Sequence, residues 1–434
     1  MRRISAMNPG PRMRLDASAL AAIAVVVLMP VVASADAYTD ARASLVAAYE
    51  AADYKAMRGA AQEALVARPG YPGALFNLAL AQLLDGDTDA SLGTLERLLA
   101  MRIDFGIADV EDFAPLQEHP GWQRYADAVA KLNAPVGAAA VAFTLDEPQF
   151  IPEGIALDSR GRLYLGSIRD GRIVRVGDTP ETLVSPGIGG HWSVFGMRIQ
   201  NDEGLWFASA STPQFAGPRD RSAYKTGLFF LDAESGEVTR QARLPVSGEQ
   251  QVLGDLVIVD GDTIIATDQA DGVVYRYSIP DDKYTVLVDR GTFVSPQGLV
   301  LDATGEHLYV ADYVGGLFRV ALDTGAVQRV STPDAVSDYG IDGLYRHGRQ
   351  LVAIQNGIRP HRVVSLSLSD DGLAVNHAGI LAMNLPEFDE PNLGVVAGDS
   401  FLFIANSHWN RFDRDNRLPE DLAGPVILEI SLSD

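Results

Sequence analysis

Two carboxylates in this chain occupy equivalent positions in a repeated pattern. Glu153 and Asp342 each directly precede a glycine that opens a short apolar stretch, and Gln297 stands before another such glycine. Two carboxylates and an amide oxygen suit a hard cation such as Ca²⁺, which also accepts water ligands. The same three side chains could instead hydrogen-bond nearby backbone groups or hold water. Both interpretations stay open at this point.

Polar loops elsewhere hold side chains that could act on a bound substrate. A neutral imidazole beside a cation can take a proton from water. The candidates for this role are three of the seven histidines: His191, His361 and His408. The candidates for substrate contact are the arginines and tryptophans of the same loops: Arg169, Trp192, Arg359 and Trp409. A single histidine of this kind is more commonly structural or solvated, so these roles depend on whether the fold gathers the side chains.

A repeated unit predicts how these residues are positioned. Six times a glycine opens a short apolar strand, at intervals of 42 to 58 residues, and further strands and a polar loop follow it. The six glycines are Gly154, Gly196, Gly254, Gly298, Gly343 and Gly394. Repeats of this length with three or four strands are typical of β-propeller blades. We therefore predict a mainly β chain in which residues 138–434 form a six-bladed β-propeller.

The propeller prediction places the candidate residues on one face. The innermost strand of each blade runs away from the mouth of the central channel, and the second strand returns to it. The residue before each glycine and the loop after each second strand therefore meet at the mouth. The predicted ring around the mouth consists of Glu153, Phe195, Leu253, Gln297, Asp342 and Leu393. The loops that carry the three histidines lie on the same side.

The sixth blade has too few strands of its own. It opens at Gly394 and continues with apolar stretches at 401–405 and 426–432, which makes three strands. We expect residues 138–145 to supply its outer strand, because pairing the first and last strands closes the ring and leaves few exposed edges. In that strand Val141, Phe143 and Leu145 are expected to be buried.

Residues 36–133 have a helical, alanine-rich pattern with a different period. One set of residues recurs 34 positions later: Ala52, Asp53, Ala56 and Gly59 return as Gly86, Asp87, Ala90 and Gly93. Small residues at this spacing let paired helices approach closely. The pattern resembles two tetratricopeptide repeats, at about 38–70 and 71–103, followed by a helix near 121–132. A docking surface for a protein partner and a small helical domain that leans on the propeller both fit it.

The N-terminus and the composition indicate where the protein works. Four arginines precede an apolar run over 17–32 that ends in Ala33-Ser34-Ala35. This predicts a signal peptide over 1–35 and a periplasmic or secreted bacterial protein, with a single membrane anchor as the alternative. The lack of cysteine excludes disulfides and thiolate chemistry. A formal net charge of −22 argues against nucleic acid and, once the signal is removed, against membrane surfaces as partners.

The blade openings resemble those of a known family. Pro152-Glu153-Gly154, Ser295-Pro296-Gln297-Gly298-Leu299 and Ile341-Asp342-Gly343-Leu344 are each followed by a strand pair. They are similar to the gluconolactonase/regucalcin family of six-bladed propellers and, more distantly, to paraoxonases and strictosidine-synthase-like proteins. The resemblance implies a divalent cation, usually Ca²⁺, held by Glu, two Asn and Asp, and hydrolysis of sugar lactones or related esters. It implies Glu153 as the glutamate ligand, and Asp342 as the aspartate ligand and general base.

The chain departs from the family pattern at two of the four ligand positions. Gln297 stands where one asparagine is expected. Val252-Leu253 precedes the glycine of the third blade, so the other asparagine has no counterpart there, and Asp255 is the nearest oxygen donor.

Two hypotheses about function follow. The leading one is an exported, Ca²⁺-dependent hydrolase of small lactones or related esters. The alternative is a non-catalytic propeller that binds a ligand or a protein, with the helical region as a docking module. The chain contains no Gly-x-Ser-x-Gly elbow, phosphate loop or dinucleotide fingerprint, so hydrolysis by an elbow serine and nucleotide chemistry have no support.

Overall fold

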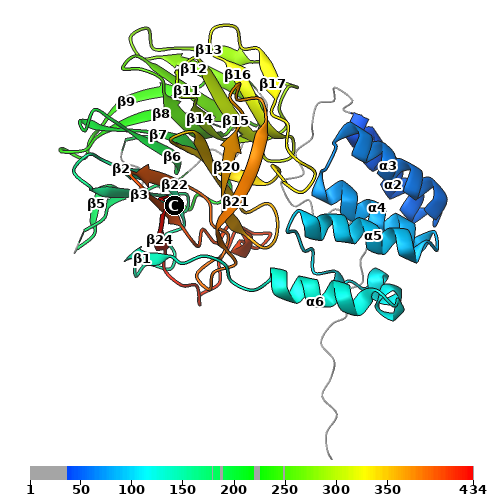
Figure 1. Cartoon of the computed structure of the whole chain (residues 1–434). Coiled ribbons are helices and arrows are strands. Elements are labelled where there is room, and N and C mark those ends of the chain that lie inside the picture. The colour runs from blue at the N-terminus through cyan, green and yellow to red at the C-terminus, as the bar shows by residue number, and fades with distance from the viewer. Residues whose placement is uncertain (1–36, 178, 186–188, 219–224, 248–249, 434) are drawn as a thin grey trace, which may run out of the picture. The chain divides into compact units, whose positions relative to one another are not determined.

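A computed structural model of the chain contains the predicted propeller. It describes residues 37–433 except 178, 186–188, 219–224 and 248–249. Six antiparallel sheets of four strands each follow a group of α-helices (Figure 1). The prediction of a six-bladed β-propeller preceded by an α-helical segment is confirmed.

The first five blades each use four consecutive strands. Blade one consists of β2 (Pro152–Leu157), β3 (Leu163–Ser167), β4 (Ile173–Arg175) and β5 (Glu181–Val184). Blade two consists of β6 (Ser193–Gln200), β7 (Gly204–Ala210), β8 (Thr226–Asp232) and β9 (Val238–Arg243). Blade three consists of β10 (Leu253–Ile258), β11 (Thr263–Asp268), β12 (Val273–Ser278) and β13 (Lys283–Val288). Blade four consists of β14 (Pro296–Leu301), β15 (His307–Asp312), β16 (Gly316–Ala321) and β17 (Val327–Arg329). Blade five consists of β18 (Ile341–His347), β19 (Gln350–Gln355), β20 (Arg362–Leu368) and β21 (Val375–Met383).

The sixth sheet joins the two ends of the propeller sequence. Its strands are β22 (Gly394–Ala397), β23 (Ser400–Ile404), β24 (Val426–Ser431) and β1 (Ala140–Thr144). β1 lies antiparallel to β24 and is the outer strand of this sheet. The expected burial of Val141 is wrong, because 54% of that residue is exposed; Phe143 is partly buried and Leu145 is buried.

The repeated glycines allow the inner strands of neighbouring blades to come close together. A Cβ atom added at Gly298 would lie 2.5 Å from the backbone nitrogen of Leu344 and 2.6 Å from the backbone oxygen of Asp342, in the next blade. A Cβ atom at Gly154 would lie 2.4 Å from the backbone oxygen of Phe195. Since backbone atoms cannot turn away as a flexible side chain can, only glycine fits at these contacts.

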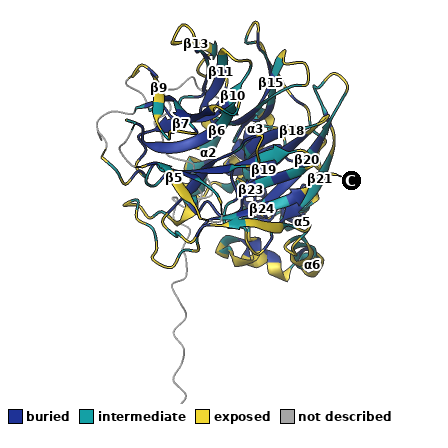
Figure 2. Ribbon diagram, turned by 90° about the vertical axis from the view of Figure 1, so that its left-hand side faces the viewer, coloured by how far each residue is buried: buried dark blue, intermediate teal, exposed yellow. Residues whose placement is uncertain are grey.

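The core lies between the blades, because both faces of most strands are covered. Every residue of β3 and β7 is buried, whereas the outer strands β9 and β13 are largely exposed or partly exposed (Figure 2). Large aromatic side chains bridge neighbouring blades: the rings of Trp206 and Tyr277 lie 5.9 Å apart, and those of Tyr345 and Phe401 lie 5.0 Å apart. A strand that is covered on both faces has apolar residues at consecutive positions, so apolar and polar residues do not alternate along these strands.

The helical segment is a separate unit. Its helices are α2 (Ala37–Glu50), α3 (Tyr54–Ala67), α4 (Pro72–Leu84), α5 (Thr88–Ala100) and α6 (Trp122–Leu132), with 3₁₀ helices at Ile107–Asp109 and Glu111–Glu118. The 34-residue repeat marks the turns that join paired helices. Asp53 and Asp87 each accept a hydrogen bond from the backbone three residues later, at 3.0 Å, as helix N-caps do.

The small residues of that repeat do not have the role expected from the sequence. A Cβ atom at Gly59 or Gly93 would meet nothing within 4 Å, so neither glycine marks a close approach of helices. Ala52 and Gly86 instead adopt left-handed backbone conformations, with φ of 53° and 89°, at the turns. The repeat therefore encodes turn geometry and helix caps.

The sequence offered two interpretations of the N-terminus, a signal peptide and a membrane anchor. The predicted signal peptide over 1–35 lies outside the described residues. In the part of the chain that the structure describes, no helix combines the length and the apolar character that a bilayer span requires.

Candidate functional site

Glu153 lies at the start of the first inner strand, β2, and is held by two hydrogen bonds. The residue is only 8% exposed. Its Oε2 accepts one hydrogen bond from Asn392 Nδ2 and one from the indole Nε1 of Trp409, each 2.5 Å long. The indole is itself placed against Phe195, with ring centres 6.4 Å apart. Residues of the first, second and sixth blades thus converge on this carboxylate.

Asp342 takes the equivalent position in the fifth blade, at the start of β18, and is held in a similar way. Its Oδ2 accepts a hydrogen bond of 2.6 Å from Asn356 Nδ2. The amide oxygen of Asn356 accepts a bond of 2.9 Å from the hydroxyl of Tyr313 in the fourth blade. That second bond fixes which end of the amide faces the carboxylate.

The two carboxylates influence each other. Burial raises the pKa of Glu153 well above its usual range, and the negative charge of Asp342 raises it further. Loss of solvent raises the pKa of Asp342 to about 6, and the negative charge of Asp255 acts in the same direction. The two groups therefore lie at the same end of the channel, as the propeller geometry predicts, and both resist ionisation.

Glu390 is a third carboxyl group of this region. Burial raises its pKa to about 7, with smaller increases from the charges of Asp342 and Asp389. One of its oxygens accepts a hydrogen bond of 2.7 Å from the backbone nitrogen of Asn410. The positive charge of Arg359 lowers the pKa of Glu390. Arg359, a predicted substrate contact, therefore lies beside the acidic cluster, which consists of Glu153, Asp342 and Glu390.

Each carboxylate of the pair keeps one oxygen available. Among the described residues no hydrogen bond reaches Glu153 Oε1 or Asp342 Oδ1. The amide oxygens of the two asparagines already accept hydrogen bonds: Oδ1 of Asn392 accepts the backbone N–H of Leu393 at 2.6 Å, and Oδ1 of Asn356 accepts the Tyr313 hydroxyl at 2.9 Å. A cation here would therefore draw on two carboxylate oxygens, with water and other oxygens completing its shell.

The amide group of Gln297 is partly engaged within its own blade. Its amide nitrogen donates a hydrogen bond of 3.0 Å to Ser295 Oγ in its own blade. The amide oxygen is the atom left to face a cation. Among the described residues no three His, Asp or Glu side chains form a group suited to a metal ion. The predicted donor set of two carboxylates and one amide would fit Ca²⁺ only with several water ligands.

His191 and Trp192 lie in the packing between the first two blades. His191 is 3% exposed, its Nε2 lies 2.7 Å from the backbone oxygen of Gly171, and its ring packs on Phe207 at 5.2 Å. Trp192 is 8% exposed and packs against Phe229 at 6.1 Å. The structure does not bring either side chain to the Glu153 cluster.

The other two histidines have different surroundings. His408 is buried between Asp389 Oδ2, 2.9 Å from its Nδ1, and the backbone oxygen of Ala423, 3.1 Å from its Nε2. Both ring nitrogens are thereby engaged, so His408 orders the loop that carries Trp409. Burial lowers the pKa of His361 to about 4, and the charge of Arg359 contributes to the decrease, so its imidazole is neutral at neutral pH.

Arg169 connects loops of three blades. Its Nη1 donates to the backbone oxygens of Gln214, at 3.2 Å, and Asn416, at 3.4 Å. It therefore braces the rim of the channel.

The sequence reasoning missed three residues of the cluster: Asn392, Asn356 and Glu390. Asn392 stands one position before the predicted ring member Leu393, which is 4% exposed. The signal in the sequence was a polar residue, Asn392, next to an apolar ring residue. The prediction considered only the residue directly before each glycine and therefore did not include Asn392.

Comparisons with known proteins leave the activity open. The model of the strictosidine synthase-like N-terminal family matches residues 138–176, which hold β1 to β4. No curated protein matches the chain. The solved structures that are similar include the PQQ-bound aldose sugar dehydrogenase of Streptomyces coelicolor, with 15% identity over 69% of this chain and 99% of that chain, and a TM-score of 0.48. They also include virginiamycin B lyase from Staphylococcus aureus (12%, 68% and 99%, TM-score 0.43) and a protein assigned as a gluconolactonase (17%, 69% and 94%, TM-score 0.44). Similarity at this level assigns no activity to this chain, so function has to be argued from the site.

Proposed function

We propose that this protein is an exported hydrolase of small lactones or related esters, and that it works at the channel mouth with a divalent cation, Ca²⁺. The observation that carries the proposal is the pair Glu153 and Asp342. Each is anchored through one oxygen by an amide side chain, and each leaves its other oxygen available. The charge of Asp342 raises the pKa of Glu153, and two carboxylates that interact in this way resist joint ionisation unless a proton or a cation lies between them.

The residues have distinct roles in this proposal. Glu153, Asp342 and the amide oxygen of Gln297 hold the cation. When bound, the cation supplies a Lewis acid for the ester carbonyl and the positive charge that lets both carboxylates ionise. Trp409 and Asn392 keep Glu153 in place, and Asn356 does the same for Asp342.

Asp342 takes the proton in the hydrolytic step. Water oxygen attacks the carbonyl carbon of the lactone, and the carboxylate of Asp342 accepts the proton that the water loses. The ring C–O bond then breaks, and that proton passes to the departing alkoxide, so lactone and water give a hydroxy acid. With the cation bound, Asp342 would be ionised at the working pH, and an ionised carboxylate can accept this proton. His361, which is neutral at this pH, is the second candidate base.

The experiment compares metal content and lactone hydrolysis in the wild type, Asp342→Asn and Glu153→Gln. Both variants keep the shape and the hydrogen-bond acceptor of the original side chain. Both should lose Ca²⁺ and hydrolysis together, with hydrolysis reduced by about a hundredfold or more. Asp370→Asn, whose side chain is 98% exposed, is the matched control and should behave as the wild type. Variants that bind no metal and still hydrolyse lactones at the wild-type rate would refute the proposal.

The alternative function is a non-catalytic propeller. It is favoured by the apolar half of the ring, because Phe195, Leu253 and Leu393 are all buried and carry no chemistry. In that case the helical unit is the docking module for a protein partner. A wild-type protein that holds no divalent cation and hydrolyses no lactone, yet binds a ligand at Trp409, would support this function.

A further inference from the structure

The channel contains a cavity beyond the acidic cluster. The cavity has a volume of about 360 Å³, and all six inner strands line it. Its lining residues follow the blade glycines in sequence, whereas Glu153 and Asp342 precede them. Since every inner strand runs away from the mouth, the cavity lies toward the opposite, exit end of the channel.

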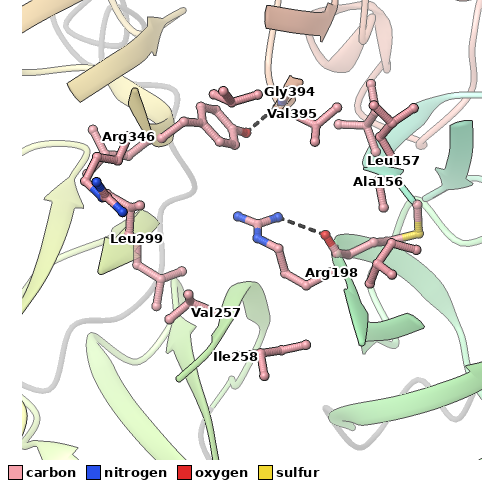
Figure 3. Close-up of a pocket in the computed structure, with 16 residues that line it drawn as sticks. Ala156, Leu157, Arg198, Val257, Ile258, Leu299, Arg346, Gly394 and Val395 are labelled. Atoms are coloured by element: carbon pink, nitrogen blue, oxygen red, sulfur yellow. Dashed lines mark hydrogen bonds between the residues drawn. The ribbon is translucent and has the colours of Figure 1, made fainter. Parts of the chain in front are cut away.

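The exit cavity opens to solvent at its far side. Along the first five inner strands the residue just after the glycine is buried and those further on are more exposed: Leu299 is buried and Val300 is partly exposed, and Tyr345 is buried and Arg346 is exposed. The walls are mainly aliphatic, with Val257, Ile258 and Leu299 among them (Figure 3). A ligand can therefore enter from the exit end without passing the acidic cluster.

The polar groups of the exit cavity are positively charged. Two arginines, Arg198 and Arg346, are among the lining residues, and no Asp or Glu is. This contrasts with the whole chain, in which 57 acidic residues outnumber 35 basic ones. Figure 3 shows the guanidinium group of Arg198 in the middle of the ring of side chains.

Arg198 is held in a way that leaves donors available. Its Nη1 donates to the backbone oxygen of Met197 at 2.9 Å, and its Nη2 donates to Asp255 Oδ2 at 3.0 Å. A guanidinium group has five N–H donors, so three have no partner among the described residues. Asp255 balances the charge of Arg198. Among the described residues Arg346 donates only to the backbone oxygen of Gly348 and has no acidic partner, so its charge is unbalanced there.

We propose that the exit cavity binds a small organic anion with an apolar body, whose carboxylate is held by Arg198 and Arg346. The aliphatic walls take up the apolar body, and a cavity of this volume holds about ten non-hydrogen atoms. The unused donors of Arg198 and the unbalanced charge of Arg346 select a single negative charge, because guanidinium–carboxylate pairs form strong charge-assisted bonds. The proposal does not depend on lactone hydrolysis at the mouth.

The test uses calorimetric titration of the full chain at neutral pH and constant ionic strength. The probes are octanoate, 1-octanol and octylammonium, which share the apolar body and differ in charge, and acetate, which lacks the body. Octanoate should bind at least about tenfold more tightly than the other three, a difference of about 1.4 kcal/mol. Equal binding of octanol, or no octanoate binding at millimolar concentration, would overturn the proposal.

Variants locate the binding. Arg346→Gln should weaken octanoate binding by about tenfold, since it removes the unbalanced charge. Arg349→Gln is the matched control: it removes an arginine of the same blade that pairs with the exposed Asp370 and does not line the cavity. If both variants weaken octanoate binding equally, the loss comes from the change in the net charge of the protein and the proposed site is refuted.

Two further variants separate the site from folding and from the mouth. Arg198→Met alone would leave Asp255 buried without its partner, so it is combined with Asp255→Asn. This double variant should fold and lose octanoate binding; a folded double variant with wild-type affinity would contradict the proposal. Glu390→Gln should bind octanoate as the wild type does, even though it alters the mouth.

Discussion

Replacement of Asp342 by asparagine is predicted to stabilise the metal-free propeller at neutral pH. Loss of solvent in the fold raises the pKa of this carboxyl group from 3.8 to about 6. The folded protein therefore keeps its proton at pH values where the unfolded chain has released it. As pH rises from about 4 through 6, the unfolded state gains relative to the folded state, and the free energy of unfolding falls.

The shift sets the size of the effect. One pKa unit corresponds to about 1.4 kcal/mol, so the raised pKa of Asp342 costs the wild type about 3 kcal/mol above pH 6. Asparagine carries no charge to desolvate, and its amide oxygen can still accept the hydrogen bond from Asn356. The difference in unfolding free energy between Asp342→Asn and the wild type should grow from about zero near pH 4 to about 3 kcal/mol at pH 7.5. The charge of Asp342 also raises the pKa of Glu153, so its removal lowers that cost in the same direction.

The assay is urea unfolding at several pH values in the presence of a chelator. Tryptophan fluorescence reports mainly on the propeller, which holds Trp192, Trp206 and Trp409 of the four tryptophans. Asp370→Asn, at an exposed position, should leave the pH profile unchanged. Millimolar Ca²⁺ should stabilise the wild type and remove the advantage of the variant, because a bound cation offsets the charge of Asp342. A variant that is less stable than the wild type at pH 7.5, or equally more stable at pH 4, would refute the reasoning.

Two further predictions concern the packing that positions the site. Gly298→Ala should destabilise the propeller by about 2–3 kcal/mol in the same urea assay, because its Cβ would lie within 2.6 Å of the neighbouring backbone beside Asp342. Gly261→Ala is the control and should have little effect, because its Cβ would meet nothing within 4 Å. Leu145→Ala, at a buried position beside β1, should lower the free energy of unfolding by about 2–4 kcal/mol. Val141→Ala, at a position that is 54% exposed, should lower it by less than about 0.5 kcal/mol. Equal losses would show that β1 does not close the sixth blade as its pairing with β24 indicates.

The sequence predicted the propeller and the positions of Glu153 and Asp342 through a single signal. The blade glycines mark contacts at which a Cβ atom cannot be placed, so their period gave the number of blades and the register of each inner strand. Because register in a strand determines which residue stands at the channel mouth, two carboxylates could be placed there from the sequence. The three-strand sequence of the sixth blade indicated an outer strand from before Glu153, and β1 pairs with β24.

The loop residues could not be placed in the same way. The direction of a loop side chain depends on contacts between blades, which leave no periodic pattern. His191 turns inward onto Phe207, while Trp409, from a loop of similar composition, reaches Glu153. The partners that hold the carboxylates, Asn392 and Asn356, are likewise fixed by bonds to Leu393 and Tyr313 that no spacing in the sequence reveals.

The energetic cost of the acidic cluster is itself an argument that the cluster has a function. Burial raises the pKa of Glu153, Asp342 and Glu390, so each destabilises the metal-free fold at neutral pH. Amides are accommodated in the same region of the channel, as Asn392 and Asn356 demonstrate, and amides at the acidic positions would remove that cost. Carboxylates that are held in place by amides and destabilise the fold are expected where a charge or a proton is needed for chemistry.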